Sequence, residues 1–323
     1  MSSIVKRKIS GKEYYYLEVT LRVGKKIAKV YEYLGRKKPS QKELIKRKKL
    51  LEEKAISKYY SSRLDKMHFS ILSRKELAEV EMVKDNFLAR FAKLSKSRRK
   101  DYEKNQVVHF VYTTLRTEGV DVDYSDVETA FDIIDRKRKN EYTFDNKVIV
   151  SSSMITGFNY LPKIGINKKD LLRLHGIIMS SFENKSPGQL RDDQRIIAKF
   201  NPLTSKSEEI DYRPPSPNAV ESELENFFKW FEKNKNIHPL ELAALVHLKI
   251  YLIHPFKDGN KRMCRLLFNK ALQDAGYPIL NISRDTSEYF KELIKSVESG
   301  NEKFFVKFCY HAFIRQVKHR RLN

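Results

Sequence analysis

The first forty residues carry an alternating pattern of apolar and polar side chains that the rest of the chain lacks. The segments Ile4–Ile9, Glu13–Val23 and Lys26–Leu34 alternate or concentrate β-branched and aromatic residues, with Gly11 and Gly24 between them. Period-two alternation interrupted by glycine is typical of antiparallel strands joined by tight turns. The pattern therefore predicts a small three-stranded antiparallel meander.

After the meander the apolar residues recur at helical spacing. A highly charged helix is predicted from Pro39 and Ser40 to about Lys58, and further helices follow, one of them near Arg74–Leu94. The segment Asn105–Gly119 has one apolar stripe, formed by Val107, Val108, Val111, Tyr112 and Leu115. This stripe predicts a helix that packs one face against a core.

The C-terminal half of the chain is also predicted to be helical. Lys169–Ser181 reads as an amphipathic helix, and the nearly continuous apolar character of Pro239–Ile253 indicates a buried one. Leu266–Ala275 reads as a helix that ends at Gly276-Tyr277-Pro278, and another helix begins near Tyr289. The predicted fold class is therefore mainly α, preceded by a small β meander and charged helices.

Residues 254–265 read His-Pro-Phe-Lys-Asp-Gly-Asn-Lys-Arg-Met-Cys-Arg and lie between two predicted helices. The imidazole of His254 titrates near neutral pH and can accept a proton from a hydroxyl group. Asp258 offers a hard oxygen ligand, which suits a magnesium ion shared with phosphates. The run therefore combines a candidate base with a candidate metal ligand.

The same run carries groups that bind phosphate. Gly259 allows backbone geometry that is closed to other residues. The amides of Asn260, Lys261 and Arg262 would open a helix, whose N-terminus favours phosphate. Arg262 and Arg265 are three residues apart, so they share a helical face and could both reach the outer phosphates of a nucleotide. Singly, each group has an ordinary reading as a turn or a solvated helix face, but their uninterrupted order indicates a nucleotide site.

This run resembles the signature of Fic-domain proteins, His-Pro-Phe-x-Asp/Glu-Gly-Asn-Gly/Lys-Arg-x-x-Arg, at every defined position. Such proteins mostly transfer AMP from ATP to a hydroxyl side chain of a target protein. The resemblance implies a helical Fic fold with a small β-hairpin flap, with ATP as substrate and Mg²⁺ as cofactor. It also implies His254 as base, Asp258 on magnesium, Asn260 and the loop amides on the α-phosphate, and Arg262 and Arg265 on the outer phosphates.

Lys261 leaves the transferred group open. Glycine is the commoner family residue at this position, and lysine is shared with the Doc-like branch, which transfers phosphate instead. That branch tends to lack equivalents of Gly259 and Arg265, and both are present here. AMP transfer is therefore the leading interpretation, and phosphotransfer is the alternative. Lys261 also has a plain reading as a solvated lysine that the site tolerates.

A second motif lies upstream, where Thr114-x-x-x-Glu118-Gly119 matches the Fic inhibitory motif Ser/Thr-x-x-x-Glu-Gly/Asn. Thr114 and Glu118 are four residues apart and share a helical face. In the family this glutamate pairs with the last arginine of the signature, here Arg265, and obstructs productive seating of the γ-phosphate. An autoinhibited enzyme is therefore expected. In some relatives the glutamate also positions water for AMP removal, so a de-AMPylating activity stays open.

The resemblance extends to Lys169–Ser181, which is similar to the Leu-x-x-Leu-His-x-x-x-Met helix of these proteins. The family places a hairpin flap after this helix, and we expect it near Arg191–Lys199, where it would bind a target by strand addition. An ordinary surface loop is the alternative, because the usual Gly-rich sequence is missing. Tyr289 is a candidate for the adenine pocket, with core packing as the competing reading. His247 is interpreted as a core histidine and Cys264 as a helix filler.

Charge is unevenly distributed along the chain. The sequence has 64 Lys+Arg and 41 Asp+Glu, a formal net charge of +23, and residues 1–100 hold 29 of the basic residues but 11 of the acidic ones. Such an asymmetry is typical of an arm that binds a polyanion. This part of the chain could bind nucleic acid, a partner or the substrate of the enzyme, and a solvated basic face is the alternative reading. A rival function is therefore a nucleotide-sensing, nucleic-acid-binding regulatory protein that is not an enzyme.

Other features bear on location and partners. The sequence has no apolar run long enough for a membrane span, and the N-terminus does not read as a secretory leader. Two cysteines without a disulfide framework favour a reducing compartment, so a cytoplasmic protein is expected. The expected partner is a protein with a modifiable hydroxyl group, self-modification is expected as well, and a homodimer is compatible with the sequence.

These patterns predict three regions. Residues 1–38 form a small β module, residues 39–104 form a charged helical region, and residues 105–323 form a Fic catalytic domain. The last of these includes the inhibitory helix at residues 105–119.

Overall fold

The computed structural model describes residues 2–23, 26–135, 145–201, 206–282 and 286–318. By the density of contacts within the chain, it divides into two compact units. The first comprises Met1–Leu94 with Ile314–Leu322, and the second is essentially Ser95–Phe313. Each unit has its own hydrophobic core, and each is described by itself.

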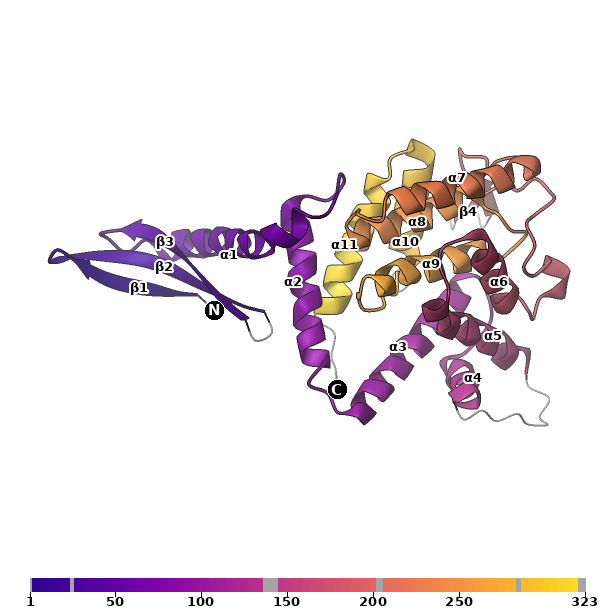
Figure 1. Ribbon diagram of the computed structural model, residues 1–323, viewed down its shortest axis with the longest axis horizontal. Coiled ribbons are helices and arrows are strands. Elements are labelled where there is room, and N and C mark those ends of the chain that lie inside the picture. The colour runs from indigo at the N-terminus through magenta and orange to yellow at the C-terminus, as the bar shows by residue number, and fades with distance from the viewer. Residues whose placement is uncertain (1, 24–25, 136–144, 202–205, 283–285, 319–323) are drawn as a thin grey trace. The chain divides into compact units, whose positions relative to one another are not determined.

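The first unit begins with the predicted meander (Figure 1). Strands β1 (Ser2–Ile9), β2 (Lys12–Val23) and β3 (Lys26–Gly35) pair antiparallel in the order β1-β2-β3. Ser10 and Gly11 form the whole loop between β1 and β2, and both have positive φ, of 47° and 75°. Two such residues produce the turn whose twist matches that of the flanking strands. The prediction of a three-stranded antiparallel sheet is confirmed.

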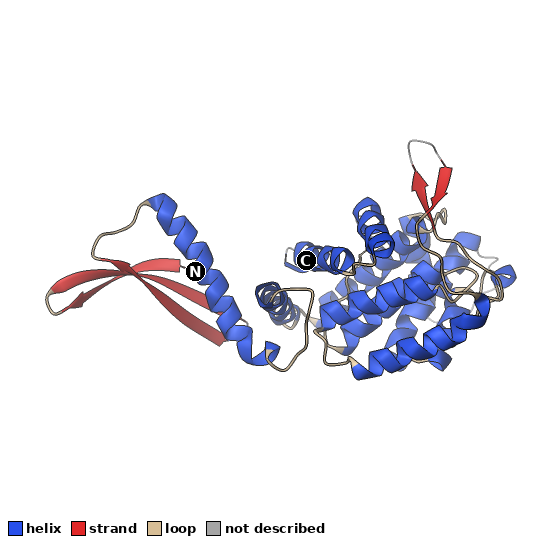
Figure 2. Ribbon diagram, turned by 90° about the horizontal axis from the view of Figure 1, so that it is seen from above, coloured by secondary structure: helices blue, strands red, loops and turns tan. Residues whose placement is uncertain are grey.

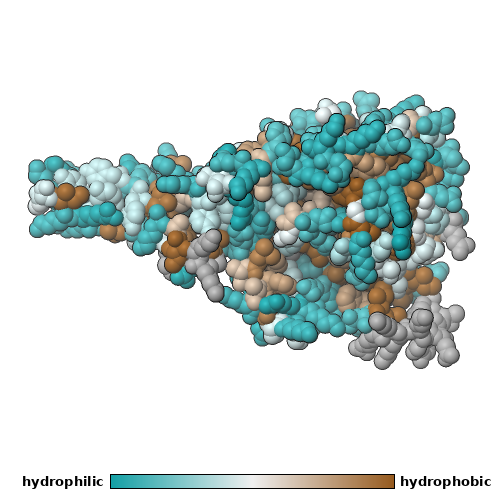
Figure 3. Space-filling view, in the orientation of Figure 1, coloured by the Kyte–Doolittle hydropathy of each residue, from teal (hydrophilic) through white to brown (hydrophobic). Residues whose placement is uncertain are grey.

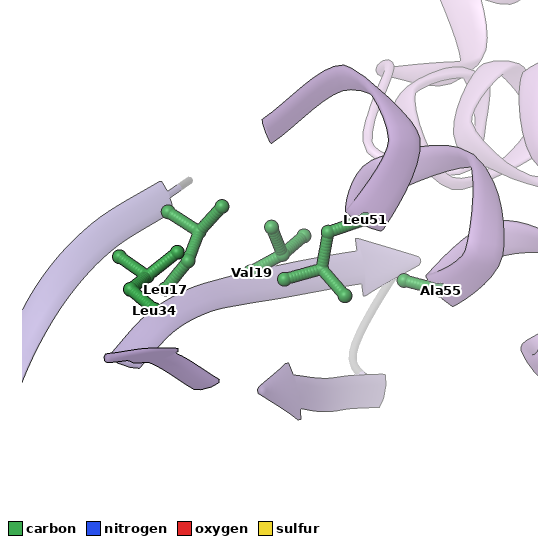
Figure 4. Close-up of a cluster of buried hydrophobic side chains, with 5 residues drawn as sticks. All are labelled: Leu17, Val19, Leu34, Leu51 and Ala55. Carbon is green, nitrogen blue, oxygen red and sulfur yellow. The ribbon is translucent and has the colours of Figure 1, made fainter. Parts of the chain in front are cut away.

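One face of this sheet is covered by helix α1 (Gln41–Leu64). The Ser40 side chain accepts a hydrogen bond from the amide of Glu43 and so caps the helix at the predicted start. A small core follows along this face, as Figure 4 shows, formed by Leu17, Val19, Leu34, Leu51 and Ala55. Helix α2 (Arg74–Phe91) packs on α1 and begins with a capping box between Ser73 and Glu76.

The regular structure of the second unit, over the residues that are described, is helical apart from one hairpin. Its helices are α3 (Lys96–Thr117), α4 (Tyr124–Asp135), α5 (Asn146–Tyr160), α6 (Lys168–Ile178), α7 (Val220–Lys233), α8 (Pro239–Ile253), α9 (Asn260–Asp274), α10 (Thr286–Ser299) and most of α11 (Lys303–Lys318). Short 3₁₀ turns at Leu161–Lys163, Glu183–Lys185 and Pro217–Ala219 join some of them. The prediction of a mainly helical protein preceded by a small antiparallel sheet is confirmed. None of the described helices is both long and apolar enough to cross a membrane.

Helices α8 and α9 form the centre of the second unit and pack closely on each other. Helix α8 has the predicted bounds, and nearly all of its side chains are buried, as its continuous apolar sequence requires. Helix α9 begins at Asn260, and its C-terminus at Asp274 is followed by Gly276 with φ of 73°. The segment between these two helices, residues 254–259, is therefore fixed at both ends by buried structure.

The expected position of the flap is corrected by the structure. The hairpin consists of β4 (Ala198–Asn201) and β5 (Lys206–Glu209), and its two red strands stand clear of the helices in Figure 2. The predicted segment Arg191–Lys199 overlaps it by two residues, and residues 191–197 form no strand. The physical reason is that Arg191 ties this segment to the 254–259 loop, since its backbone amide donates to the carbonyl of Pro255 at 3.0 Å.

Candidate active site

The chain leaves helix α8 through an unusual backbone conformation. The amide of His254 makes the last hydrogen bond of the helix, to the carbonyl of Ile250 at 3.0 Å, and the residue itself has φ of 49° and ψ of 58°. A non-glycine residue seldom adopts this left-handed region, and where one does the surrounding structure must hold it there. His254 is therefore placed by contacts around it and not by local preference.

Arg191 supplies one of these contacts. Its buried guanidinium donates from Nε to the carbonyl of His254 at 2.7 Å, and from Nη1 and Nη2 to the carbonyls of Asp193 and Pro215. One rigid side chain thus joins three loop segments. Sequence reasoning treated Arg191 as the start of the flap and missed this role. Its partners are backbone carbonyls, so no residue pattern indicates the pairing.

The loop after His254 is closed by Asn260. The Asn260 side chain accepts from the amide of Phe256 at 3.0 Å and donates to the carbonyl of the same residue at 2.8 Å. Gly259, just before it, has φ of 76°, and a Cβ there would lie 2.8 Å from the sulfur of Met179. The loop therefore needs glycine for both its conformation and its close approach to α6.

His175 of α6 packs against the same loop and stabilises it. Its ring stacks on Phe256 at 3.6 Å with an interplanar angle of 4°. The amide of Gly188 donates to Nδ1 at 2.9 Å, so Nε2 carries the proton and donates to the carbonyl of Asp258 at 3.1 Å. Burial lowers the pKa of His175 to about 4, which keeps this neutral tautomer in place at neutral pH.

The role of His175 was missed from sequence. The signal that could have found it is the Leu-x-x-Leu-His-x-x-x-Met pattern, which covers His175 and ends at Met179. Both residues contact the position where Gly259 approaches α6.

The imidazole of His254 is itself neutral. Its Nδ1 lies 3.4 Å from the carbonyl of Tyr251, which can only accept, so Nδ1 carries the proton and Nε2 has a free lone pair. Burial lowers the pKa of His254 to about 4, and the nearby cations Arg191, Lys261 and Arg195 act in the same direction. The ring can therefore accept a proton at Nε2 at neutral pH.

Asp258 and Arg262 lie at the start of α9. One oxygen of Asp258 accepts from the amide of Gly259 at 2.6 Å and lies 3.4 Å from Nη2 of Arg262, and the side chain is 39% exposed. Arg262 is buried under the ring of Phe182, and its Nε and Nη1 have no hydrogen-bond partner among the described residues. Buried donors without partners indicate a place for an anion or for ordered water.

Asp258 suits Mg²⁺ as a single partly exposed carboxylate. Among the described residues no group of three or more His, Cys, Asp or Glu side chains is placed to hold a metal ion. Magnesium usually takes one or two carboxylates and completes its shell with water and substrate phosphates. The donor set therefore fits a magnesium ion that binds together with a nucleotide, and Asp258 is the residue that would hold it.

Arg265, one turn further along α9, is fully buried and paired with Glu118. Its Nη2 donates to Oε1 of Glu118 at 2.6 Å and to the carbonyl of Thr114 at 3.3 Å. The second oxygen of Glu118 lies 3.7 Å from Nζ of Lys261. The predicted helix segment 105–119 is the C-terminal part of α3, and Glu118 is its C-terminal capping residue.

The charges around Glu118 keep it ionised. Burial alone raises the pKa of this carboxyl group, but Arg265, Lys261 and Arg262 outweigh burial and hold the pKa below its usual range. Nε and Nη1 of Arg265 have no partner among the described residues, and neither has the hydroxyl of Thr114. Glu118 and Asp258 together therefore only partly neutralise Lys261, Arg262 and Arg265, which leaves the site attractive to a polyanion.

The remaining candidates lie in the core. The hydroxyl of Tyr289 lies 3.0 Å from Nε2 of His247, and both side chains are fully buried against Phe305. Cys264 is also fully buried, and burial raises the pKa of its thiol. These positions agree with the interpretation of His247 and Cys264 as core residues. The ring of Tyr289 is buried next to Arg265, whose guanidinium carbon lies 5.9 Å from the ring centroid.

The fold is that of Fic-domain proteins. A Fic-domain signalling protein from Bacteroides thetaiotaomicron superposes with a TM-score of 0.60 at 18% identity, over 74% of this chain and 94% of that one. A Fic family protein from Desulfovibrio desulfuricans gives a TM-score of 0.62 at 20% identity, over 77% and 74% of the two chains.

Residues 165–272 match the model of the Fic/DOC family. In sequence, the chain is 31% identical over 150 residues to the protein named "Protein adenylyltransferase Fic" from Drosophila melanogaster. That match covers 46% of this chain and 28% of the relative.

Proposed function

We propose that this protein transfers AMP from ATP to a hydroxyl side chain of a protein, its own hydroxyl groups included, and that Glu118 restrains the reaction. The observation that carries the proposal is the convergence of His254, Asp258, the α9 N-terminus and two buried arginines on one loop and helix. The names of the curated relatives support the same reaction class.

In the proposed reaction the hydroxyl oxygen attacks the α-phosphorus of ATP. The new oxygen–phosphorus bond forms as the bond from the α-phosphorus to its bridging oxygen breaks, and pyrophosphate departs. The hydroxyl proton passes to Nε2 of His254, whose lone pair is free. Magnesium, when held by Asp258 and the phosphates, would offset the charge of the leaving pyrophosphate.

The phosphate contacts are proposed as follows. The amides that begin α9 lie at a helix N-terminus, where anions are favoured, so they are assigned to the α-phosphate. The side chain of Asn260 is already used to close the loop, so its backbone amide is the better donor. Arg262 and Arg265, with unpartnered buried donors, are assigned to the outer phosphates.

Glu118 and the γ-phosphate would compete for Arg265. The carboxylate lies 2.6 Å from Nη2, so a phosphate oxygen cannot take the same place without displacing it. Loss of Glu118 is therefore expected to let ATP bind with its α-phosphorus in line with the attacking hydroxyl. A water molecule held by the same carboxylate would serve the reverse reaction, removal of AMP.

Radiolabelled ATP tests the proposal and separates it from phosphotransfer. With Mg²⁺, Glu118→Ala should incorporate label from α-labelled ATP into protein, and addition of His254→Ala should abolish the incorporation. Glu103→Ala, which removes an exposed carboxylate from the same helix, is the matched control and should behave as the wild type. Incorporation from γ-labelled ATP alone would establish phosphotransfer instead. Binding of ATP by Glu118→Ala without any incorporation would contradict both.

A further inference from the structure

The three-stranded sheet has one covered and one open face. Helix α1 packs on Leu17, Val19 and Leu34. Residues that alternate with these point the other way, and there the sheet carries tyrosines on β2 and β3. Tyr31 is 42% exposed and Tyr33 is 51% exposed. Large aromatic rings are therefore presented to solvent on the face that α1 does not cover.

The strand register brings four tyrosines together. Tyr16 of β2 lies opposite Tyr33 of β3, with ring centroids 5.3 Å apart, and Tyr14 lies 6.0 Å from the same Tyr33 ring. Tyr31 joins them through Arg7 of β1, whose guanidinium carbon lies 5.0 Å from the Tyr16 centroid and 4.8 Å from that of Tyr31. The four rings and this arginine form what we call the tyrosine face: Arg7, Tyr14, Tyr16, Tyr31 and Tyr33.

Positive charge surrounds the tyrosine face. Residues 1–40 contain eleven Lys and Arg against three Glu. Arg36 lies 5.7 Å from the ring of Tyr14, and the side chains of Arg7, Lys12 and Arg22 are exposed. Lys29 is exposed too, but it pairs with Glu18 at 3.1 Å. Figure 3 shows a largely hydrophilic surface over the three strands, where Ile9 and Ile27 are the exposed large aliphatic side chains among the described residues. An apolar protein partner is therefore a poor match, whereas a polyanion with flat apolar rings is a good one.

We propose that the tyrosine face binds single-stranded nucleic acid. Exposed rings on a sheet stack on unpaired bases, and the surrounding Arg and Lys side chains contact the phosphates between them. In a duplex the faces of the bases are already stacked on each other and out of reach of Tyr31 and Tyr33. A single strand can therefore stack its bases on the tyrosine rings and place its phosphates next to the Arg and Lys side chains. We expect such binding to show little sequence preference.

This inference stands on the N-terminal unit alone and does not depend on nucleotide transfer at His254. Nucleic-acid binding would also give a role to the basic N-terminal residues, which take no part in the proposed reaction. The two proposals can therefore fail separately.

The test is fluorescence anisotropy with full-length protein and one labelled oligonucleotide, single-stranded or annealed to its complement. We expect the single strand to bind more tightly than the duplex, with an affinity that falls as salt is raised. Tyr31→Ala and Tyr33→Ala should each weaken binding by about tenfold, because each removes a ring on which a base would stack. Both rings are half exposed, so circular dichroism should find both variants folded.

Two control variants make the result specific. Tyr33→Phe keeps the ring and should bind like the wild type. Tyr124→Ala removes a comparably exposed tyrosine, 37% exposed, from α4 of the other unit and should have no effect. Tighter binding of the duplex would overturn the proposal. So would unchanged affinity in Tyr31→Ala and Tyr33→Ala, since binding would then rest on charge without stacking.

Discussion

The arginines of the candidate active site and the arginine of the tyrosine face are placed in opposite ways. In the helical unit Arg262 and Arg265 are buried, and their partners come from α3 and from the loop before α9. In the N-terminal unit Arg7 and its neighbours lie in solvent on a sheet face. Buried charge is held in one geometry, which suits chemistry at one phosphorus atom, whereas exposed charge can follow a flexible polymer. The contrast predicts large effects of single substitutions at the buried site of the helical unit and smaller ones at exposed positions.

The largest effect is expected at the base. In a Glu118→Ala background, His254→Ala should lower the rate of AMP incorporation by a factor of about 10² or more, because it removes the proton acceptor. The measurement is the initial rate with α-labelled ATP. As a control, the melting temperatures of the two proteins should be nearly the same, both with and without ATP. If the rate of AMP incorporation in the His254→Ala protein stayed within a few fold of the parent, His254 would not be the base.

Next in size is the cost of leaving Arg265 unpaired. Glu118→Ala should lower the free energy of unfolding by roughly 3–5 kcal/mol without nucleotide, because a buried charge loses its partner. ATP should then raise the melting temperature of this variant more than that of the wild type, since its phosphate replaces the carboxylate. Differential scanning calorimetry with and without ATP measures both. Equal shifts in the two proteins would mean that Glu118 and ATP do not compete.

A third prediction concerns acid stability. Burial lowers the pKa of His175 from 6.5 to about 4, so between these values the unfolded chain binds a proton that the folded chain does not. The free energy of unfolding should therefore fall as pH is lowered through this window, and His175→Asn should flatten the fall. Urea titrations at pH 7 and pH 5 measure it, with the exposed His68→Asn as control. An unchanged slope in His175→Asn would contradict the assignment.

The smallest effect is expected at Lys261. Its ammonium lies 3.7 Å from the second oxygen of Glu118 and 5.1 Å from the ring centre of Phe290. Because the side chain is about one-third exposed, the pair should contribute less than about 1 kcal/mol. Lys261→Met should therefore raise the basal rate of incorporation by a few fold, while Lys261→Arg should leave it near the wild-type value. No increase in Lys261→Met would show that Lys261 does not help to hold Glu118 in place.

Much of the fold follows from local pattern. The meander, the start of α1 and the bounds of α8 could be predicted because alternation, a serine cap and a continuous apolar run are local signals. The hairpin β4–β5 could not be placed, because its position depends on where Arg191 anchors the preceding segment.

The residues of the candidate site also fall into those that could be predicted from the sequence and those that could not. His254, Asp258 and Arg265 lie in one contiguous run, and the Glu118 motif has a fixed spacing, so both could be found in the sequence. His175 and Arg191 act on backbone atoms about eighty and sixty residues away, which no residue pattern encodes. The groups that hold the loop were therefore missed, although the groups assigned to the chemistry were not.

The central claim is that Glu118 and the γ-phosphate compete for Arg265, with AMP transfer as the consequence of losing the glutamate. Intact-mass spectrometry over a time course with ATP and Mg²⁺ tests it most directly, comparing wild type, Glu118→Ala and Glu103→Ala. The account predicts mass increases of whole adenylyl groups that accumulate fastest in Glu118→Ala, and equal, slower accumulation in the other two. Equal accumulation in all three proteins, or an added phosphoryl mass in place of adenylyl, would contradict it.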